Sequence, residues 1–166
     1  EYTGALRILK VMLSYEYLWT NIRVKGGAYG CMSGFRRTGD GFLVSYRDPH
    51  LKNTLEVFRK TGDFIRSFDA DEREMTKYII GTISELDAPL TPSAKGSMSL
   101  NAWFSGITRE DMQKERDEIL DAQPEDIRNL AGIVDAIVGQ DRICVIGSEE
   151  KIQQDKEVFK EIRHLL

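Results

Sequence analysis

The chain has 166 residues, of which 41% are hydrophobic and 30% charged, and its net charge is −4. This composition is typical of a globular protein with one sizeable core, so we expect residues 1–166 to form a single domain. The acidic balance leaves no basic footprint for nucleic acid, and no apolar run approaches the roughly 20 residues that span a bilayer. Cys31 and Cys144 favour a reducing compartment, although they leave one disulfide open.

The first predicted element is a helix from Tyr2 to Tyr17, whose apolar side chains follow two helical stripes. The stripes comprise Leu6, Leu9, Leu13 and Tyr17 on one side, and Ile8, Val11, Met12 and Tyr15 on the other. A helix that is apolar on two sides is expected to lie centrally and to pack on a sheet.

The next stretch, Leu18–Gly30, reads LWTNIRVKGGAYG and leads from this helix into a strand. The glycine pair permits backbone conformations that other residues avoid, and it leaves nearby amides uncovered. Arg23 offers a rigid fork of donors, and Tyr29 carries a hydroxyl that can donate to a developing oxyanion. By chemistry alone, most stretches of this kind are ordinary turns. A nucleotide site is disfavoured, because its glycines follow a strand and precede a helix.

Two strands are predicted from Ala28 to Arg36 and from Gly41 to Arg47. The linking Thr38-Gly39-Asp40-Gly41 favours a hairpin, because Asp-Gly and Gly tolerate the positive φ of tight turns. In the second strand Phe42, Val44 and Tyr46 alternate with the residues between them, which predicts one fully buried face.

Helices and one more strand are predicted in the rest of the chain. Asp48-Pro49 precedes a helical pattern from Leu51 to Ser67. Capping boxes at Asp71 and Thr108 predict two further helices, the second from Arg109 to Ala122 and largely exposed. A short helix is predicted from Ser97 to Phe104, and another begins at Pro124 and is ended by Gly139. A buried strand is predicted from Arg142 to Ile146, with Cys144 as an inert core thiol. A closing helix follows, with Ile152, Phe159, Ile162 and Leu166 on one side. This order predicts an α+β fold with helices packed on one face of a mostly antiparallel sheet.

The run Leu-Trp-x-x-Ile-Arg-x-x-Gly-Gly-Ala-Tyr-Gly resembles a signature in the second half of inverted zinc peptidases. These form the insulinase/pitrilysin family, and the likeness is nearest to its presequence-protease branch. It continues through the segments 44–49, 79–83, 87–89, 94–96 and 106–108 and so covers nearly the whole chain. The resemblance implies the C-terminal half of a zinc metalloendopeptidase that degrades short, unfolded peptides in a closed chamber.

The resemblance also implies roles for particular residues. Arg23 and Tyr29 would be catalytic auxiliaries that hold the substrate backbone and stabilise the tetrahedral oxyanion. Arg23 would also belong to the substrate-binding residues, together with Gly26, Gly27 and Ala28. Domains of this kind begin with a strand or hairpin before the first helix, so we expect this chain to lack its first strands and to leave a sheet edge uncovered.

The zinc motif of the family, His-x-x-Glu-His on a helix, is absent from this sequence. Its two histidines, His50 and His164, lie far apart and are expected to be surface residues. We therefore expect zinc to be bound by the N-terminal half of a longer polypeptide, with no metal site here and no activity of this chain alone. The expected partners are that half and peptide substrates. The expected compartment is the cytoplasm in a bacterium and an organelle matrix in a eukaryote. A noncatalytic peptide-binding or scaffold homologue is the alternative.

Overall fold

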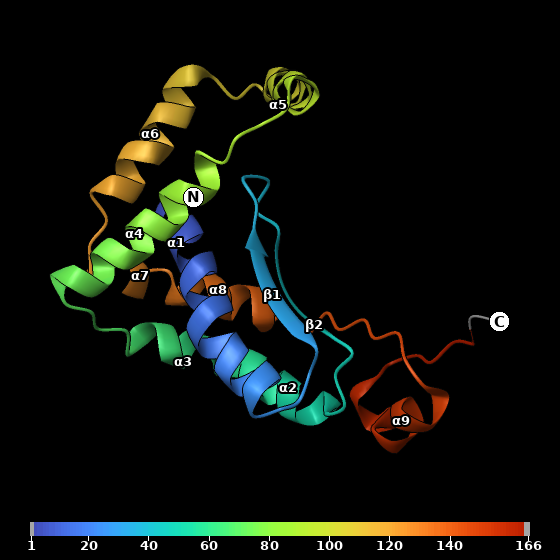
Figure 1. Ribbon diagram of the computed structural model, residues 1–166. Helices are drawn as coiled ribbons and strands as arrows, with labels where there is room; N and C mark the ends of the chain where they lie inside the picture. The colour runs from blue at the N-terminus through green and yellow to red at the C-terminus, as the bar shows by residue number, and fades with distance from the viewer. Residues whose placement is uncertain (1, 165–166) are drawn as a thin grey trace.

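The computed structural model describes residues 2–164 and combines many helices with a two-stranded antiparallel sheet (Figure 1). The predicted α+β class is therefore confirmed. In chain order the elements are α1 (Ala5–Met12), the π-helical segments η1 (Leu13–Tyr17) and η2 (Trp19–Val24), β1 (Gly30–Phe35), β2 (Gly41–Tyr46), α2 (Leu51–Arg59), α3 (Thr61–Arg66), α4 (Glu72–Leu86), α5 (Pro92–Phe104), α6 (Arg109–Leu120), α7 (Pro124–Arg128), α8 (Ala131–Val138), α9 (Glu149–Gln154) and the 3₁₀ turn η3 (Lys156–Val158).

The first helix lies at the centre of the fold, as its two apolar stripes predict. Six residues of α1 are buried on more than one side: Ala5, Leu6, Ile8, Leu9, Val11 and Met12. The helical path continues through η1 and η2 to Val24, well beyond the predicted end at Tyr17. Its hydrogen bonds widen there to the π spacing, as in the bond from the Lys25 amide to the Thr20 carbonyl (3.0 Å). Arg23 therefore lies on the last turn of a helix.

The hairpin forms as its turn chemistry predicts. Gly39 adopts a positive φ of 88°, and the Arg36 amide donates to the Asp40 carbonyl over 2.9 Å. Cys31, Phe35 and Leu43 turn inward and pack on the helical core. The other face, with Phe42, Val44 and Tyr46, is exposed, and Leu43 is only partly buried, so the prediction that one face of this strand is fully buried is wrong. Alternation shows that two faces differ, but it does not show which of them the helices cover.

Three helices after the hairpin begin directly after a residue whose side chain caps their first turn. Asp71 and Thr108 form the predicted capping boxes of α4 and α6, and α6 is mostly exposed apart from Glu115 and Ile119. Thr91 caps α5, which begins at Pro92 and so starts earlier than the predicted Ser97. The predicted helix 51–67 is divided at Lys60, where ψ is 2°. The helix after Pro124 is divided between α7 and α8.

The last part of the chain differs most from its prediction. Residues 142–146 form no strand, and Cys144 is exposed, so the predictions of a buried strand and of a core thiol are both wrong. A segment rich in β-branched residues requires a neighbouring strand to form a ladder. In Figure 1 this segment leads away from the helices to α9, which is shorter than the predicted closing helix. Leu166 lies outside the described residues.

The hydrophobic core joins the central helix to the helices around it. Its fully buried large side chains are Ile8, Leu9, Met12, Leu13, Leu18, Ile22, Ile65, Ile119, Ile127 and Val134. Leu18 and Ile22 belong to the stretch that carries Arg23, so one side of this stretch is anchored in the core while Arg23 is exposed. Among the described residues, no helix combines the length and the apolar character that crossing a membrane requires.

Candidate functional site

The candidate site is built on the tight turn between η2 and β1. Gly27 has a φ of 77°, a conformation that other residues rarely adopt. A Cβ atom on Gly26 would lie 2.5 Å from the Ile22 carbonyl oxygen, whereas one on Gly27 would meet nothing nearer than the Pro49 side chain at 3.8 Å. Gly26 is thus required because a Cβ atom has no space there, and Gly27 is required because of its positive φ.

The backbone amides of this turn are used inside the protein. The Gly27 amide donates to the Arg23 carbonyl over 3.0 Å, and the Ala28 amide donates to the Ile22 carbonyl over 3.1 Å. The Ala28 side chain is buried. These groups fix the path between Arg23 and Tyr29, and the two amides are not free donors for a ligand. The order of helix, glycines and strand is also the opposite of a nucleotide-binding turn.

Arg23 projects from the end of η2 and is held by an aromatic ring one turn earlier. Its guanidinium carbon lies 4.0 Å from the centroid of the Trp19 ring, a cation–π contact. Trp19 was not predicted as a site residue, although its i, i+4 spacing from Arg23 places both on one side of a helix. The stacked geometry restricts the guanidinium while leaving its donors free for an acceptor.

Tyr29 lies at the open end of the hairpin, where its backbone is fixed and its ring is exposed. Its amide donates to the carbonyls of Tyr46 (3.1 Å) and Arg47 (3.3 Å). The Tyr29 ring meets the Tyr46 ring edge-on, with 5.8 Å between centroids. Tyr29 is 63% exposed, so its phenol can reach a ligand without movement of the strand.

Arg47 and Tyr46 complete this end of the hairpin, and neither was predicted as a site residue. The Arg47 guanidinium carbon lies 5.6 Å from the Tyr29 ring centroid and 5.3 Å from that of Tyr46. Arg47 has a positive φ of 48°, which is uncommon for a residue with a side chain and is concentrated at functional sites. The available signal was its place before Asp48-Pro49, where a strand must end.

The pKa of the Cys31 thiol reports which charged groups lie near the first part of β1. Burial raises the pKa of the Cys31 thiol, the Arg23 charge opposes that rise, and the Asp48 carboxylate adds to it. The Arg23 charge is therefore close enough to favour the ionised form of a thiol in the first part of β1. The Asp48 carboxylate accepts hydrogen bonds from the His50 amide (2.9 Å) and the Thr54 hydroxyl (2.5 Å), so it holds the chain after β2 rather than facing a ligand.

The described residues do not fit a zinc site. His50 and His164 are both exposed, and the nearest recorded acidic partner of His164 is Glu149 at 3.9 Å. Within residues 2–164, no group of three or more His, Cys, Asp or Glu side chains is arranged to hold a metal ion. Among these described residues, Arg23 and Tyr29 therefore have no metal site beside them.

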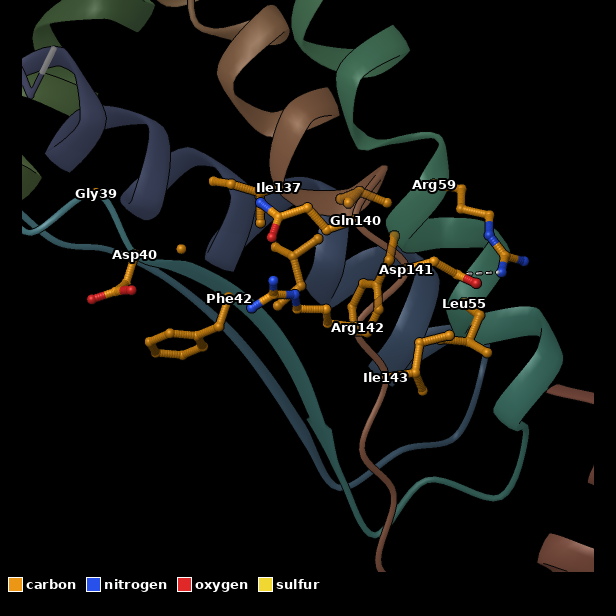
Figure 2. Close-up of a pocket in the computed structure, with 14 residues that line it drawn as sticks. Gly39, Asp40, Phe42, Leu55, Arg59, Ile137, Gln140, Asp141, Arg142 and Ile143 are labelled. Carbon is orange, nitrogen blue, oxygen red and sulfur yellow. Dashed lines mark hydrogen bonds and ion pairs between the residues drawn. The ribbon is translucent and has the colours of Figure 1, made fainter. Parts of the chain in front are cut away.

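A separate pocket of about 290 Å³ lies on the other side of β2, between the hairpin tip, α2 and the end of α8 (Figure 2). Apolar side chains that include Leu55, Ile137 and Ile143 line it, and an ion pair between Arg59 and Asp141 (3.2 Å) lies at its rim. Because Arg59 and Asp141 already pair with each other and neither Arg23 nor Tyr29 reaches this pocket, we favour the turn and the hairpin end as the candidate site.

Comparison with known proteins shows the family of this chain. Residues 1–149 match the PreP C-terminal domain, and the chain belongs to that family. It is 46% identical over its whole length to "Protein HypA" of Clostridium perfringens. It is 35% identical over its whole length to presequence protease 1, chloroplastic/mitochondrial, of Arabidopsis thaliana, and 34% identical over 77% of its length to the mitochondrial presequence protease of Xenopus tropicalis.

The chain spans only a small part of these relatives: 17% of the Clostridium protein, 16% of the Arabidopsis protein and 12% of the Xenopus protein. The resemblance noted in the sequence is therefore confirmed as membership of a C-terminal domain family. The relatives are much longer polypeptides than this chain.

Proposed function

We propose that this chain is the C-terminal substrate-binding and auxiliary catalytic domain of a zinc-dependent metalloendopeptidase that degrades short, unfolded peptides in a closed chamber. Its membership of the PreP C-terminal domain family and the names of its relatives as presequence proteases support this proposal. Zinc and the general base would come from the N-terminal half of the same polypeptide, because the residues described here do not fit a metal site.

The observation that carries the proposal is that the Tyr29 side chain is exposed while its backbone is fixed by hydrogen bonds. A hydroxyl that stabilises an oxyanion must be reachable by substrate and must not have to reorganise during the reaction. Tyr29 is 63% exposed, while its amide is tied to the end of β2 by the bond to Tyr46. In the proposed reaction this hydroxyl donates a hydrogen bond to the oxygen of the attacked carbonyl.

Arg23 has the complementary role of holding the substrate backbone. Its guanidinium presents several donors in fixed directions, which suits a peptide carbonyl. Gly26, Gly27 and Ala28 contribute to substrate binding through the shape of the turn, which sets the position of Tyr29 relative to Arg23. The compartment would follow the organism, as the cytoplasm in a bacterium and the organelle matrix in a eukaryote, where several relatives are named mitochondrial.

The proposal is tested by measuring cleavage of a quenched fluorescent peptide with zinc present. This chain alone, the separately expressed N-terminal half, and their mixture are compared, with metal content and association of the two halves measured in parallel. Activity that requires both halves supports an auxiliary domain. Association without activity favours the noncatalytic scaffold alternative, and zinc-dependent cleavage by this chain alone contradicts the assignment of zinc to the other half.

A further inference from the structure

Arg47, the residue after β2, lies beside Tyr29, the residue before β1. The Arg47 guanidinium carbon is 5.6 Å from the centroid of the Tyr29 ring and 5.3 Å from that of the Tyr46 ring. The two rings meet edge-on, with 5.8 Å between their centroids and 83° between their planes. Each of these three side chains therefore contacts the other two. We call Tyr29, Tyr46 and Arg47 the hairpin-end cluster.

The backbone of Arg47 is held by hydrogen bonds on both sides. On the strand side, the Tyr29 amide donates to the carbonyls of Tyr46 (3.1 Å) and of Arg47 itself (3.3 Å). On the other side, the Asp48 carboxylate accepts a hydrogen bond (2.5 Å) from the hydroxyl of Thr54, a buried residue of α2. The Arg47 side chain therefore extends from a fixed point of the chain, as the Tyr29 side chain does.

The backbone conformation at Arg47 is one that glycine adopts more easily. Its φ of 48° costs free energy for a residue with a Cβ atom, whereas glycine adopts such an angle without this cost. The turn alone would therefore favour glycine at this position. The side chain adds the two ring contacts, since the neighbouring Asp48 carboxylate accepts hydrogen bonds from the His50 amide and the Thr54 hydroxyl and not from Arg47.

We propose that Arg47 is a positioning residue, which holds the Tyr29 ring in the orientation in which its hydroxyl meets the attacked carbonyl of the substrate. A cation is attracted to the face of an aromatic ring, so the ring is restricted to orientations that keep the contact. A donor to an oxyanion must be oriented before the reaction begins, since reorientation during the reaction raises the barrier. Tyr46 supports the same ring from its edge. This inference rests on the proposed function, because Arg47 acts through Tyr29 of that same site.

The test uses the full-length protein and the cleavage kinetics of one quenched fluorescent peptide. Arg47→Gly removes the side chain and suits the positive φ, so the variant should fold while kcat falls about three- to tenfold. KM should change by less than about twofold, because the contact acts on the transition state and not on substrate binding. Arg47→Lys keeps a cation beside the rings and should recover part of the loss. Arg36→Ala is the matched control: the Arg36 guanidinium carbon lies 5.8 Å from the Phe42 ring centroid at the other end of the hairpin, and its loss should leave kcat unchanged.

A double-substitution cycle separates action through Tyr29 from any other effect of Arg47. If Arg47 acts through the Tyr29 hydroxyl, adding Arg47→Gly to Tyr29→Phe should lower kcat further by less than about twofold. A loss of the same factor in both backgrounds overturns the proposal, since Arg47 then acts independently of that hydroxyl. An unchanged kcat in Arg47→Gly also overturns it. In that case a large loss in Tyr29→Phe still supports the proposed function, so the two ideas fail separately.

Failure of the proposed function gives a different result. If Tyr29→Phe leaves kcat unchanged, or if the full-length protein cleaves no peptide, the catalytic role of Tyr29 is wrong. The positioning of its ring is then measured directly, by fluorine NMR of the full-length protein with fluorotyrosine in place of Tyr29. Movement of this resonance in Arg47→Gly, but not in Arg36→Ala, supports the positioning of the ring by Arg47. A resonance that Arg47→Gly leaves in place overturns the proposal.

Discussion

The Arg23 guanidinium carbon lies 4.0 Å from the centroid of the Trp19 ring, one helical turn before it. A long, flexible side chain at a helix end would otherwise lose considerable rotamer entropy when it binds a ligand. Stacking on an indole removes part of that freedom in advance and leaves the donors of the guanidinium available. Under the proposed function, this contact would prepare Arg23 for binding the substrate backbone.

We predict that Trp19→Ala in the full-length protein lowers kcat/KM for peptide cleavage about two- to fivefold, which corresponds to losing an exposed cation–π contact. Trp19→Phe keeps an aromatic face and should lose less. Steady-state kinetics on one peptide measures both, with circular dichroism as the check on folding. A Trp19→Ala protein that is folded and as active as the unmodified one would show that the stack does not prepare Arg23.

Tyr29→Phe in the full-length protein removes the hydroxyl and keeps the ring that packs on Tyr46. Loss of one oxyanion donor typically costs about 10²- to 10³-fold in turnover, so kcat should fall by that order. Zinc content and thermal stability should be unchanged. Tyr15→Phe on η1 is the control, because Tyr15 is exposed and lies outside the candidate site. An unchanged kcat for Tyr29→Phe contradicts the assigned role.

Local signals predicted the parts of the fold that depend on neighbours in the chain. The capping boxes at Asp71 and Thr108 and the turn at Gly39 formed where the sequence indicates them, because each satisfies its own backbone groups. The glycine turn after Arg23 was indicated in the same way, whereas the continuation of the helix to Val24 and the exposure of Tyr29 were not predicted.

Features that depend on distant partners were not predicted. Residues 142–146 have the composition of a strand, yet a strand also requires a neighbouring edge to pair with, and none forms there. The break at Lys60 lies within a helical pattern that was predicted to run from Leu51 to Ser67. The contacts of Arg47 with Tyr29 and Tyr46 depend on a positive φ that the residue type does not indicate.

The two glycines of the turn should respond differently to alanine. In Gly26→Ala the new Cβ atom would lie 2.5 Å from the Ile22 carbonyl oxygen, so the helix end must shift, at a cost of about 1–3 kcal/mol. In Gly27→Ala there is space, but φ is 77°, which costs about 1–2 kcal/mol.

Urea unfolding of the chain measures both changes. Gly132→Ala in α8 is the control: nothing lies within 4 Å of its added Cβ atom, and alanine in a helix should stabilise by about 0.5–1 kcal/mol. If Gly26→Ala and Gly27→Ala are as stable as the unmodified chain, the turn is not as restricted as its geometry indicates.

Glu115 is a buried carboxylate that joins α6 to α1 and to the turn of the hairpin. It accepts hydrogen bonds from the Tyr2 hydroxyl (2.7 Å) and from the guanidinium groups of Arg7 and Arg37. Burial alone would raise the pKa of Glu115, but the hydrogen bonds from Arg7, Tyr2 and Arg37 outweigh it and hold this pKa below its usual value. The ionised form is therefore favoured in the folded state.

A carboxylate whose pKa is lower in the folded state stabilises the fold above its unfolded pKa, about 4.3 for Glu, and this stabilisation is lost as pH falls through the folded value. We predict that Glu115→Gln lowers the free energy of unfolding by about 1–3 kcal/mol at pH 7. The difference from the unmodified chain should shrink as pH falls below about 4. Urea unfolding at several pH values measures it, with Glu56→Gln, an exposed carboxylate of α2, as the control. A difference that stays constant down to acid pH would show that the Glu115 charge does not hold these elements together.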